Sequence, residues 1–489
     1  LFTSVMLINI TLCATLLCVL AASATQRKNV LLICVDDLRP ELNCFGVDYI
    51  HSPNIDRLAA SGRAFHNHYV NAPTCGASRY SLLTGGYYPE AKNYALFDRA
   101  KQLKDGDRFV RPSLPAWFRK HGYTTTAIGK ISHHPGGLGG KNWDNPSQVE
   151  MPDAWDENLQ PLGDWQHPRG VMHALAEGKI RTEANKLDVF EAFDGDDQSY
   201  PDGLIADKAL KQLELLAASD QPFFLAVGFI RPHLPFGAPK QYHDLYAELE
   251  LPPIPHADKP QHQSTWHSSG EFMKYERWSR NPNTDLAFAD EVRRHYAACV
   301  SYVDAQVGKL MECLDQSRLR ENTVVILWGD HGWHLGEHGI WGKHTLFEES
   351  LRSPLIISYP KIPQAGQAST AIVETTDIFP TLCELAELPV PKYLNGTTLR
   401  PHLQDPNSKG HDAVSYQSGR QTLRNENYRL ILHASGYVEL YDHSNLQGET
   451  VNVARDHPEI VKRMKKTLLD RFDKRNEKLI APQGFDLKR

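Results

Sequence analysis

Two stretches of the chain carry neighbouring side chains that together could bind a divalent cation. Asp36 and Asp37 directly follow a long apolar run, and Asp330 and His331 follow another such run. Adjacent side chains of a strand point to opposite faces, so two carboxylates share a ligand only where the strand curls into a loop. Ligands that are mostly carboxylates favour Ca²⁺ or Mg²⁺ over Zn²⁺. The pattern predicts an oxygen-rich cation site, with simple turn capping by the Asp pair as the alternative.

The segment from Thr74 to Gly85 places a cysteine and an arginine one helical turn apart. Cys75 stands at the predicted start of a short helix, where the positive end of the helix dipole favours negative charge. Arg79 follows one turn later and therefore lies on the same face. Both features favour an anionic nucleophile or an anionic substrate. A lone cysteine would more often be structural, but for this whole string the functional interpretation is favoured.

The elements that must position these residues alternate between short β-branched runs and helical patterns. This alternation is typical of a parallel α/β architecture. Predicted strands lie at residues 29–35, 123–128, 223–230 and 323–328. Predicted helices lie at residues 53–60, 113–121 and about 291–316, and a further helix is expected to be capped by Asp202.

Polar residues recur just beyond the C-terminal ends of these predicted strands. Lys130 and His233 occupy such positions, as do the two acidic stretches described above. In open parallel sheets ligands bind at that edge, so groups that are hundreds of residues apart in sequence are expected to converge there.

Two long segments, at residues 134–172 and 251–283, are rich in Pro, Gly, Trp and His and show no clear period. We expect them to form surface loops over one rim of the sheet, where long loops are usually functional.

The pattern changes after residue 400. Alternating segments at residues 428–433 and 437–441 predict a small antiparallel sheet, and an amphipathic helix is expected near residues 459–474. The sequence therefore predicts a catalytic domain at residues 27–400 and a smaller domain at residues 401–489.

Residues 1–26 have the pattern of a cleaved export signal. The run from Leu7 to Ala21 is uncharged and too short to span a bilayer comfortably, and Ala22-Ser23-Ala24 supplies small residues for a signal peptidase. No Lys or Arg precedes this run, and a retained membrane anchor is the alternative. We expect a periplasmic or extracellular protein, lysosomal in an animal host, without stable membrane insertion after cleavage.

Composition excludes several classes of protein. The chain of 489 residues has 53 Lys and Arg against 59 Asp and Glu, a formal net charge of −6, and 41% hydrophobic residues. It is too apolar for a disordered chain, and its weakly acidic balance argues against a nucleic-acid partner.

The six cysteines after residue 26 contain no CxxC pair, which excludes a disulfide scaffold or a zinc ribbon. One or two disulfide bridges among them are an open alternative.

The stretch Cys75–Arg79, with Thr84 and Gly85, resembles the signature of the type I sulfatases, although Ala77 stands where proline is commoner. Further short motifs match blocks of that family in the same order. They are Val35–Asp37, Gly129–Lys130 with His133, Arg231–His233, Gly329–Gly332 and Gly342–His344.

The resemblance implies an alkaline-phosphatase-like α/β fold, with a mostly parallel sheet flanked by helices and a smaller C-terminal α+β domain. It implies that Cys75 is converted to formylglycine by a maturation enzyme, and that the hydrated aldehyde is the nucleophile. It further implies a Ca²⁺ site, with Mg²⁺ as the alternative ion. The implied metal ligands are Asp36, Asp37, Cys75, Asp330 and His331.

The same resemblance implies roles for the remaining site residues. Arg79 would hold the hydrate, and Lys130 and Lys343 would clamp the sulfate. His233 would stabilise or protonate the leaving alkoxide, and His133 would act as the base that releases sulfate. Trp333 could stack on a sugar ring or equally pack in the core.

These implied roles are physically coherent. A sulfate monoester is anionic, so an oxygen nucleophile needs nearby cations to offset repulsion and to absorb charge on the transferred group. A hydrated aldehyde has two hydroxyls: one attacks sulfur, and the other ejects sulfate by C–O cleavage, which a plain Ser or Cys could not do.

Within the family, residues 223–236, 301–310 and 331–344 are most similar to the iduronate-2-sulfatases. This similarity implies a sulfuric ester hydrolase that removes sulfate from a sulfated saccharide, specifically a 2-O-sulfated uronate. Two alternatives stay open: a phosphonate monoester hydrolase or phosphodiesterase of the same superfamily, and a non-catalytic glycan-binding relative.

Overall fold

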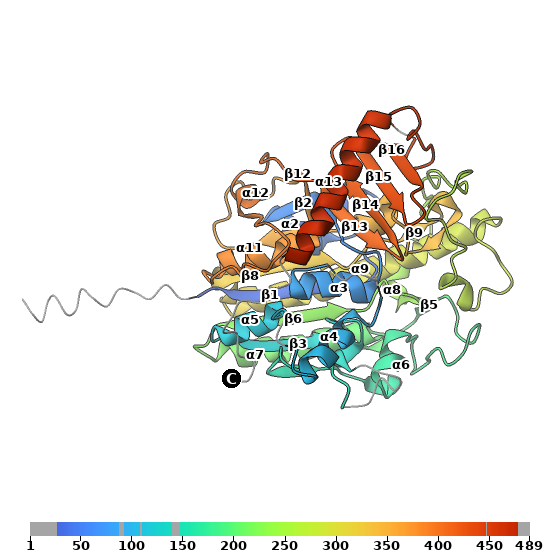
Figure 1. The fold of residues 1–489 in the computed structure, drawn as a ribbon. Helices are drawn as coiled ribbons and strands as arrows, with labels where there is room; N and C mark the ends of the chain where they lie inside the picture. Colours follow the sequence, from blue (N-terminus) through green and yellow to red (C-terminus); the bar gives the residue numbers. More distant parts are fainter. Residues whose placement is uncertain (1–26, 88–91, 108–109, 139–146, 446, 478–489) are drawn as a thin grey trace, which may run out of the picture.

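The computed structural model describes residues 27–87, 92–107, 110–138, 147–445 and 447–477, so the predicted export signal lies outside the described residues. A sheet of eight strands forms its centre, in the order β12-β2-β11-β8-β1-β6-β3-β4 (Figure 1). Its strands are β1 (Asn29–Val35), β2 (Arg63–Tyr69), β3 (Thr124–Gly129), β4 (Glu157–Leu159), β6 (Phe223–Phe229), β8 (Thr323–Gly329), β11 (Leu355–Ser358) and β12 (Ser369–Glu374). The predicted α/β fold is confirmed.

The four predicted strands are confirmed and lie next to one another in the middle of this sheet. Strand β1 pairs in parallel with β6 on one side and with β8 on the other, and β3 pairs in parallel with β6. All seven residues of β1 are buried, as expected for a strand covered on both faces. Strand β11 is antiparallel to both of its neighbours, so the sheet is mixed.

Helices cover both faces of the sheet. One face, with Leu31 and Ile33 of β1, packs against three helices: α2 (Pro53–Ala60), α7 (Pro201–Ala217) and α9 (Leu286–Gln316). The opposite face, with Val30 and Leu32, packs against α3 (Cys75–Thr84), α4 (Ala95–Lys104), α5 (Leu114–Lys120), α11 (Ile378–Leu385) and α12 (Arg400–Gln404). The alternation along β1 thus divides the core into two layers.

Two details of the predicted helices are corrected. Asp202 does not cap α7, because it lies inside the helix and its carboxylate accepts hydrogen bonds from the amides of Ile230 and Arg231, at 2.5 and 3.3 Å. Helix α9 begins at Leu286, earlier than predicted, and is capped by Asp285. Leu286 is 76% exposed and lies outside the apolar face of α9, although Phe288 and Ala289 of the same turn are buried in the core.

The two segments without a clear period contain more structure than expected. In the first, β4 joins the edge of the main sheet beside β3, and α6 (Pro168–Met172) follows it. The second is irregular except for a short 3-10 turn at Phe272–Lys274, and Phe272 and Tyr275 are fully buried. Short elements near these segments are β5 (Phe190–Phe193), β7 (Phe236–Pro239), α8 (Lys240–His243), β9 (His334–Leu335), β10 (Trp341–Gly342) and α10 (Glu348–Leu351).

The predicted C-terminal sheet and helix are confirmed. Its four antiparallel strands are β13 (Ala413–Gln417), β14 (Arg420–Arg424), β15 (Tyr428–His433) and β16 (Val438–Asp442), and α13 (Pro458–Glu477) lies across them (Figure 1). Met464 and Leu468 of α13 pack on Val414 and Leu430 of this sheet. Because α12 packs with the main sheet and β13 begins only at Ala413, we propose that the domain division lies between them.

All six cysteines of the described residues are free thiols, so none of the bridges left open by the sequence is formed there. Four of the six are buried, as expected for small apolar side chains. Among the described residues, none of the helices is both long enough and apolar enough to cross a bilayer.

Candidate active site

Strands β1 and β8 bring the two acidic stretches together. Val35 pairs with Gly329, and the amide of Asp330 donates to the carbonyl of Val35 at 3.1 Å. Asp37 has a φ of 58°, in the left-handed region, so the chain curls immediately after β1. The amide of Asp37 then donates to Asp330 Oδ1 at 2.9 Å. Asp36 and Asp37 can therefore face one site, because the strand curls into a loop where they lie.

Four of the predicted metal ligands form a compact, buried group. Asp36, Cys75, Asp330 and His331 each offer a donor atom, and these atoms all lie within 4.8 Å of one another. The ring Nδ1 of His331 bonds the carbonyl of Gly332 at 2.9 Å, which leaves Nε2 free to act as a ligand. The fifth, Asp37, lies beside the group, with Oδ1 at 3.3 Å from His331 Nε2.

The charges of the carboxylates suit a divalent cation. Burial raises the pKa of Asp37 well above its usual range, and burial together with the charge of Asp36 raises that of Asp330 to about 7. Burial acts on Asp36 in the same direction, but Lys130, His233 and Arg79 outweigh it and hold its pKa well below the usual range. So many carboxylates in a buried space repel one another, and a bound cation would balance them.

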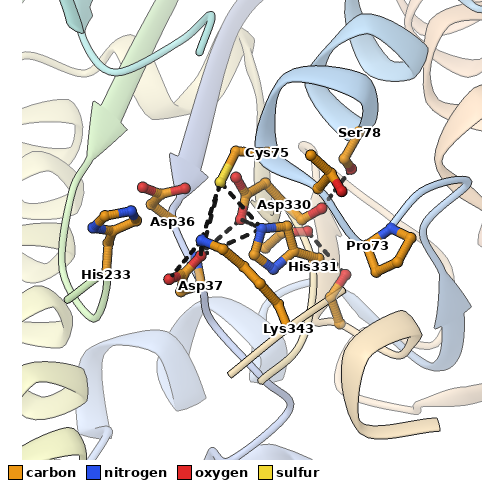
Figure 2. A network of polar contacts seen from close by, with 12 residues as sticks. Asp36, Asp37, Pro73, Cys75, Ser78, His233, Asp330, His331 and Lys343 are labelled. Carbon is orange, nitrogen blue, oxygen red and sulfur yellow. Dashed lines mark hydrogen bonds and ion pairs between the residues drawn. The ribbon is translucent and has the colours of Figure 1, made fainter. Parts of the chain in front are cut away.

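Cys75 is the first residue of α3 and points into this group (Figure 2). Its Sγ lies 3.2 Å from His331 Nε2 and 3.3 Å from Lys343 Nζ. The next residue must be small, because a Cβ on Gly76 would lie 2.2 Å from the backbone oxygen of Asn93. Burial and the charge of Asp36 raise the pKa of the Cys75 thiol well above its usual range, so the expected stabilisation of a thiolate is outweighed.

Arg79 links the acidic residues that directly follow β1 and β8. It is fully buried, and its Nε donates to Asp330 Oδ2 at 3.0 Å while Nη2 donates to Asp36 Oδ1 at 3.2 Å. Nη1 donates to the carbonyl of Ile131 at 3.0 Å. The planar fork of the guanidinium thus fixes two metal-site carboxylates and the chain after β3.

The two predicted sulfate-binding lysines form ion pairs with different members of the acidic pair. Lys130 forms an ion pair with Asp36, and Lys343 Nζ lies 2.7 and 3.0 Å from the two carboxylate oxygens of Asp37. Both lysines are buried. Although burial opposes its charge, Asp37 holds the pKa of Lys343 well above the usual range, so this ammonium stays charged beside Cys75.

The two predicted catalytic histidines, His233 and His133, are both buried but have different neighbours. His233 lies close to Asp36 in Figure 2, and its Nδ1 bonds the carbonyl of Leu234 at 2.7 Å. Burial, Lys130 and Lys343 hold the pKa of His233 well below its usual range. His133 is buried within electrostatic range of Lys130 and Asp36, and its ring packs on His134 at 4.8 Å.

Trp333, for which the sequence left sugar stacking and core packing equally open, is enclosed by other side chains. Its side chain is 0% exposed and packs edge-to-face on Phe236, and Lys343 Nζ lies 5.3 Å from the centre of its ring. Of the two roles that the sequence left open for Trp333, this packing favours the one in the core, beneath Lys343.

Sequence reasoning did not identify Glu271 as a site residue. Its carboxylate lies 3.6 Å from His233 Nε2, 3.7 Å from Lys343 Nζ and 3.9 Å from His344 Nε2. Lys343 and His344 hold its pKa below the usual range despite burial. Glu271 comes from the second irregular segment, whose composition indicated function but in which no spacing pointed to this residue.

Comparisons with known proteins agree with this geometry. The sulfatase family model matches residues 28–388, and that of the C-terminal region of N-sulphoglucosamine sulphohydrolase matches residues 336–475. Iduronate 2-sulfatase of Mus musculus is 33% identical over 401 residues, covering 76% of this chain and 70% of the mouse protein.

Solved structures share the fold at lower identity. The phosphonate monoester hydrolase of Agrobacterium radiobacter is 22% identical, with a TM-score of 0.71 over 92% of this chain and 96% of its own. A protein solved in complex with its substrate D-glucosamine-2-N,6-O-disulfate is 21% identical, with a TM-score of 0.70 over 92% of this chain and 98% of its own. These likenesses establish the alkaline-phosphatase-like architecture, and the family match goes further: the chain belongs to the sulfatase family, whose members hydrolyse sulfate esters.

Proposed function

We propose that this sulfatase removes the 2-O-sulfate from a sulfated uronate of a saccharide, with a nucleophile made from Cys75. The observation that carries the proposal is the environment of Cys75. Its sulfur lies 3.2 Å from His331 and 3.3 Å from Lys343, at the centre of a buried group that combines metal-binding carboxylates with fixed cations. The identity to iduronate 2-sulfatases supports the choice of sugar.

The position of Cys75 also supports its conversion to formylglycine. An unmodified thiol at this position is a weak nucleophile, because burial and Asp36 raise its pKa. Sulfatases generally use formylglycine, whose hydrated aldehyde would supply the attacking oxygen. The chain's own contribution is to hold that position between Lys343 and His331 and to keep water out.

The donor set fits a divalent cation, and we propose Ca²⁺, with Mg²⁺ as the alternative. Asp36, Asp330 and His331 would hold the ion together with position 75, and Asp37 lies close enough to complete the site. Carboxylate-rich sites of this kind suit hard cations. The ion would supply a positive charge next to the group that attacks sulfur.

Lys130 and Lys343 provide the sulfate clamp in this proposal. Each ammonium is buried and held by one carboxylate of the acidic pair, so neither has to be reoriented from bulk water when the substrate binds. Preorganised cations of this kind stabilise the charge that develops on a transferred sulfuryl group.

His233 is proposed to assist the leaving group. Its Nδ1 is occupied by the carbonyl of Leu234, so Nε2 is the nitrogen that faces the site. A bound anionic sulfate would offset Lys130 and Lys343, the two cations that lower the pKa of His233, and would thereby favour the protonated ring.

The His233→Gln substitution tests this role through its dependence on the leaving group. We expect kcat on an alkyl sulfate to fall by about 10²–10⁴-fold, since an alkoxide needs a proton. We expect a much smaller loss on 4-nitrophenyl sulfate, whose leaving group is stable as an anion. An equal loss on both substrates would contradict the acid role.

Removal of the metal tests the proposed ion site. After treatment with a chelator, we expect turnover of 4-nitrophenyl sulfate to fall by at least about 10²-fold, because the buried carboxylates lose the charge that balances them. The melting temperature should fall with it. Addition of Ca²⁺ or Mg²⁺ should restore both, and the more effective ion identifies the native one. Full activity with no metal bound by elemental analysis would contradict the site.

Release of inorganic sulfate across a panel of sulfated saccharides tests the proposed substrate. We expect the highest kcat/KM on a terminal 2-O-sulfated uronate. An aryl phosphodiester serves as the comparison, because a strong preference for the diester would identify a phosphonate monoester hydrolase or phosphodiesterase instead.

The predicted export and cleavage after residue 24 can be checked separately by N-terminal sequencing of the mature protein.

A further inference from the structure

Arg181 lies beside the proposed site and is held in one orientation. Its guanidinium carbon is 4.6 Å from the centre of the Tyr275 ring, a cation–π arrangement. Nη2 donates to His173 Nε2 at 3.4 Å. A stacked and hydrogen-bonded guanidinium is preorganised for planar recognition of an anion.

A chain of hydrogen bonds connects this guanidinium to His233. His173 Nδ1 lies 3.0 Å from the Tyr275 hydroxyl, which in turn donates to the carbonyl of Leu234 at 3.2 Å. The same carbonyl accepts from His233 Nδ1 at 2.7 Å. The rings of His173 and His233 are 5.5 Å apart, so Arg181 is separated from the proposed leaving-group residue by a single imidazole.

Arg181 also retains an unused hydrogen-bond donor. Its Nη1 is buried and has no hydrogen-bond partner within the described part of the chain, and no carboxylate there forms an ion pair with it. Arg280 provides the contrast: it stacks on Phe288 at 4.7 Å in the same way, but it forms ion pairs with Asp285 and Glu291, each at 2.8 Å. A buried cationic donor without an acceptor is unfavourable, and an anionic ligand would relieve it.

The charge of Arg181 acts on the same space as the proposed sulfate clamp. The carboxylate of Glu271 lies 3.7 Å from Lys343 and 3.6 Å from His233. Lys343 and Arg181 both lower its pKa, so the charge of Arg181 and that of the proposed clamp act on the same group. Arg181 therefore adds a positive charge to the surroundings of Glu271, the carboxylate that contacts both Lys343 and His233.

We propose that Arg181 binds the carboxylate of the uronate whose sulfate is held by Lys130 and Lys343. This inference rests on the proposed function and makes Arg181 a specificity residue for acidic sugars. The planar fork matches a carboxylate, and charge-assisted pairs of this kind are among the stronger hydrogen bonds in proteins. A neutral sugar with the same sulfate would leave Nη1 unpaired.

The test compares two substrates in three proteins. The substrates are a disaccharide with a terminal 2-O-sulfated uronate and the same disaccharide with the carboxylate reduced to an alcohol. The proteins are the wild type, Arg181→Gln and the matched control Arg280→Gln. In the wild type and in the control we expect the carboxylated substrate to have a kcat/KM about 10- to 100-fold higher. In Arg181→Gln we expect this ratio to fall close to unity.

Three outcomes of this experiment would overturn the role proposed for Arg181. If both rates fall together in Arg181→Gln and the ratio is retained, the residue is structural and the inference is overturned. If the wild type hydrolyses both disaccharides equally well, no group of this protein reads the carboxylate, and the inference is overturned as well. If the wild type hydrolyses neither disaccharide but does hydrolyse 4-nitrophenyl sulfate, the proposed uronate substrate is wrong and Arg181 loses its assigned ligand with it.

Discussion

Cys75→Ala is expected to abolish hydrolysis of sulfate esters, with a loss in kcat of at least about 10⁴-fold. The substitution removes the thiol that must be converted to the formylglycine nucleophile of the proposed mechanism, and it also removes one of the four grouped metal donors. The folded state should be little affected, because the change deletes a single sulfur atom and destabilises by about 1 kcal/mol. Turnover of 4-nitrophenyl sulfate and the melting temperature measure the two effects.

Cys299→Ala is the matched control for this experiment. Cys299 is also fully buried and free, and it lies in α9, where its thiol donates to the carbonyl of Gly237 at 3.6 Å. We expect the control to lose a similar small amount of stability and to retain its kcat. Substantial turnover by Cys75→Ala would instead indicate a metal hydrolase that uses Asp330 and His331 without a covalent nucleophile.

Arg79→Lys is expected to have the second-largest effect, on both activity and stability. Lysine keeps the positive charge but has no planar fork, so it cannot contact Asp36, Asp330 and the carbonyl of Ile131 at the same time. Breaking a fully buried ion pair costs about 3–5 kcal/mol. The metal-site carboxylates would lose their positions, and we expect kcat to fall by at least about 10²–10³-fold.

Arg63→Lys separates the catalytic part of that effect from the structural part. Arg63 is equally buried, but its guanidinium donates to backbone carbonyls, among them those of His402 at 3.1 Å and Pro363 at 2.8 Å. We expect this variant to lose stability while the folded protein keeps its kcat. If Arg79→Lys likewise lost stability but kept kcat, the arginine would be a purely structural residue.

The part of the site that the sequence predicted well is the part fixed by strand ends. Asp36 and Asp330 follow buried strands whose periodicity is unambiguous, and parallel pairing of those strands leaves little freedom in where the next residues lie. The same reasoning placed Lys130 and His233 at the correct edge of the sheet. Topology therefore determined which polar residues converge, even across hundreds of positions.

The parts that the sequence did not predict depend on irregular backbone and on competition between partners. Glu271 lies in a segment without a period, and Arg181 lies in the irregular chain between α6 and β5. No spacing could therefore indicate that Glu271 approaches Lys343 and His233, or that Arg181 approaches His173. Asp202 has a good capping residue type, but the amides after β6 provide a stronger set of donors. Trp333 shows that composition cannot distinguish a stacking aromatic from a core aromatic.

The pKa of the Cys75 thiol likewise could not be predicted from the sequence. The helix N-terminus and Arg79 predict a stabilised thiolate, but both are local features. Burial and the charges of Asp36 and Asp330 act in the opposite direction and dominate, and only the folded arrangement shows this. A cysteine that is a poor thiolate at the centre of a cationic, metal-binding pocket is more readily explained as the precursor of another nucleophile.

The mass of the peptide that contains Cys75, measured on protein with demonstrated sulfatase activity, tests the account most directly. Protein produced together with a formylglycine-generating enzyme should yield a peptide about 18 Da lighter than the unmodified cysteine form, and the converted fraction should follow the specific activity across preparations. An intact thiol at Cys75 in fully active protein would contradict the proposed nucleophile.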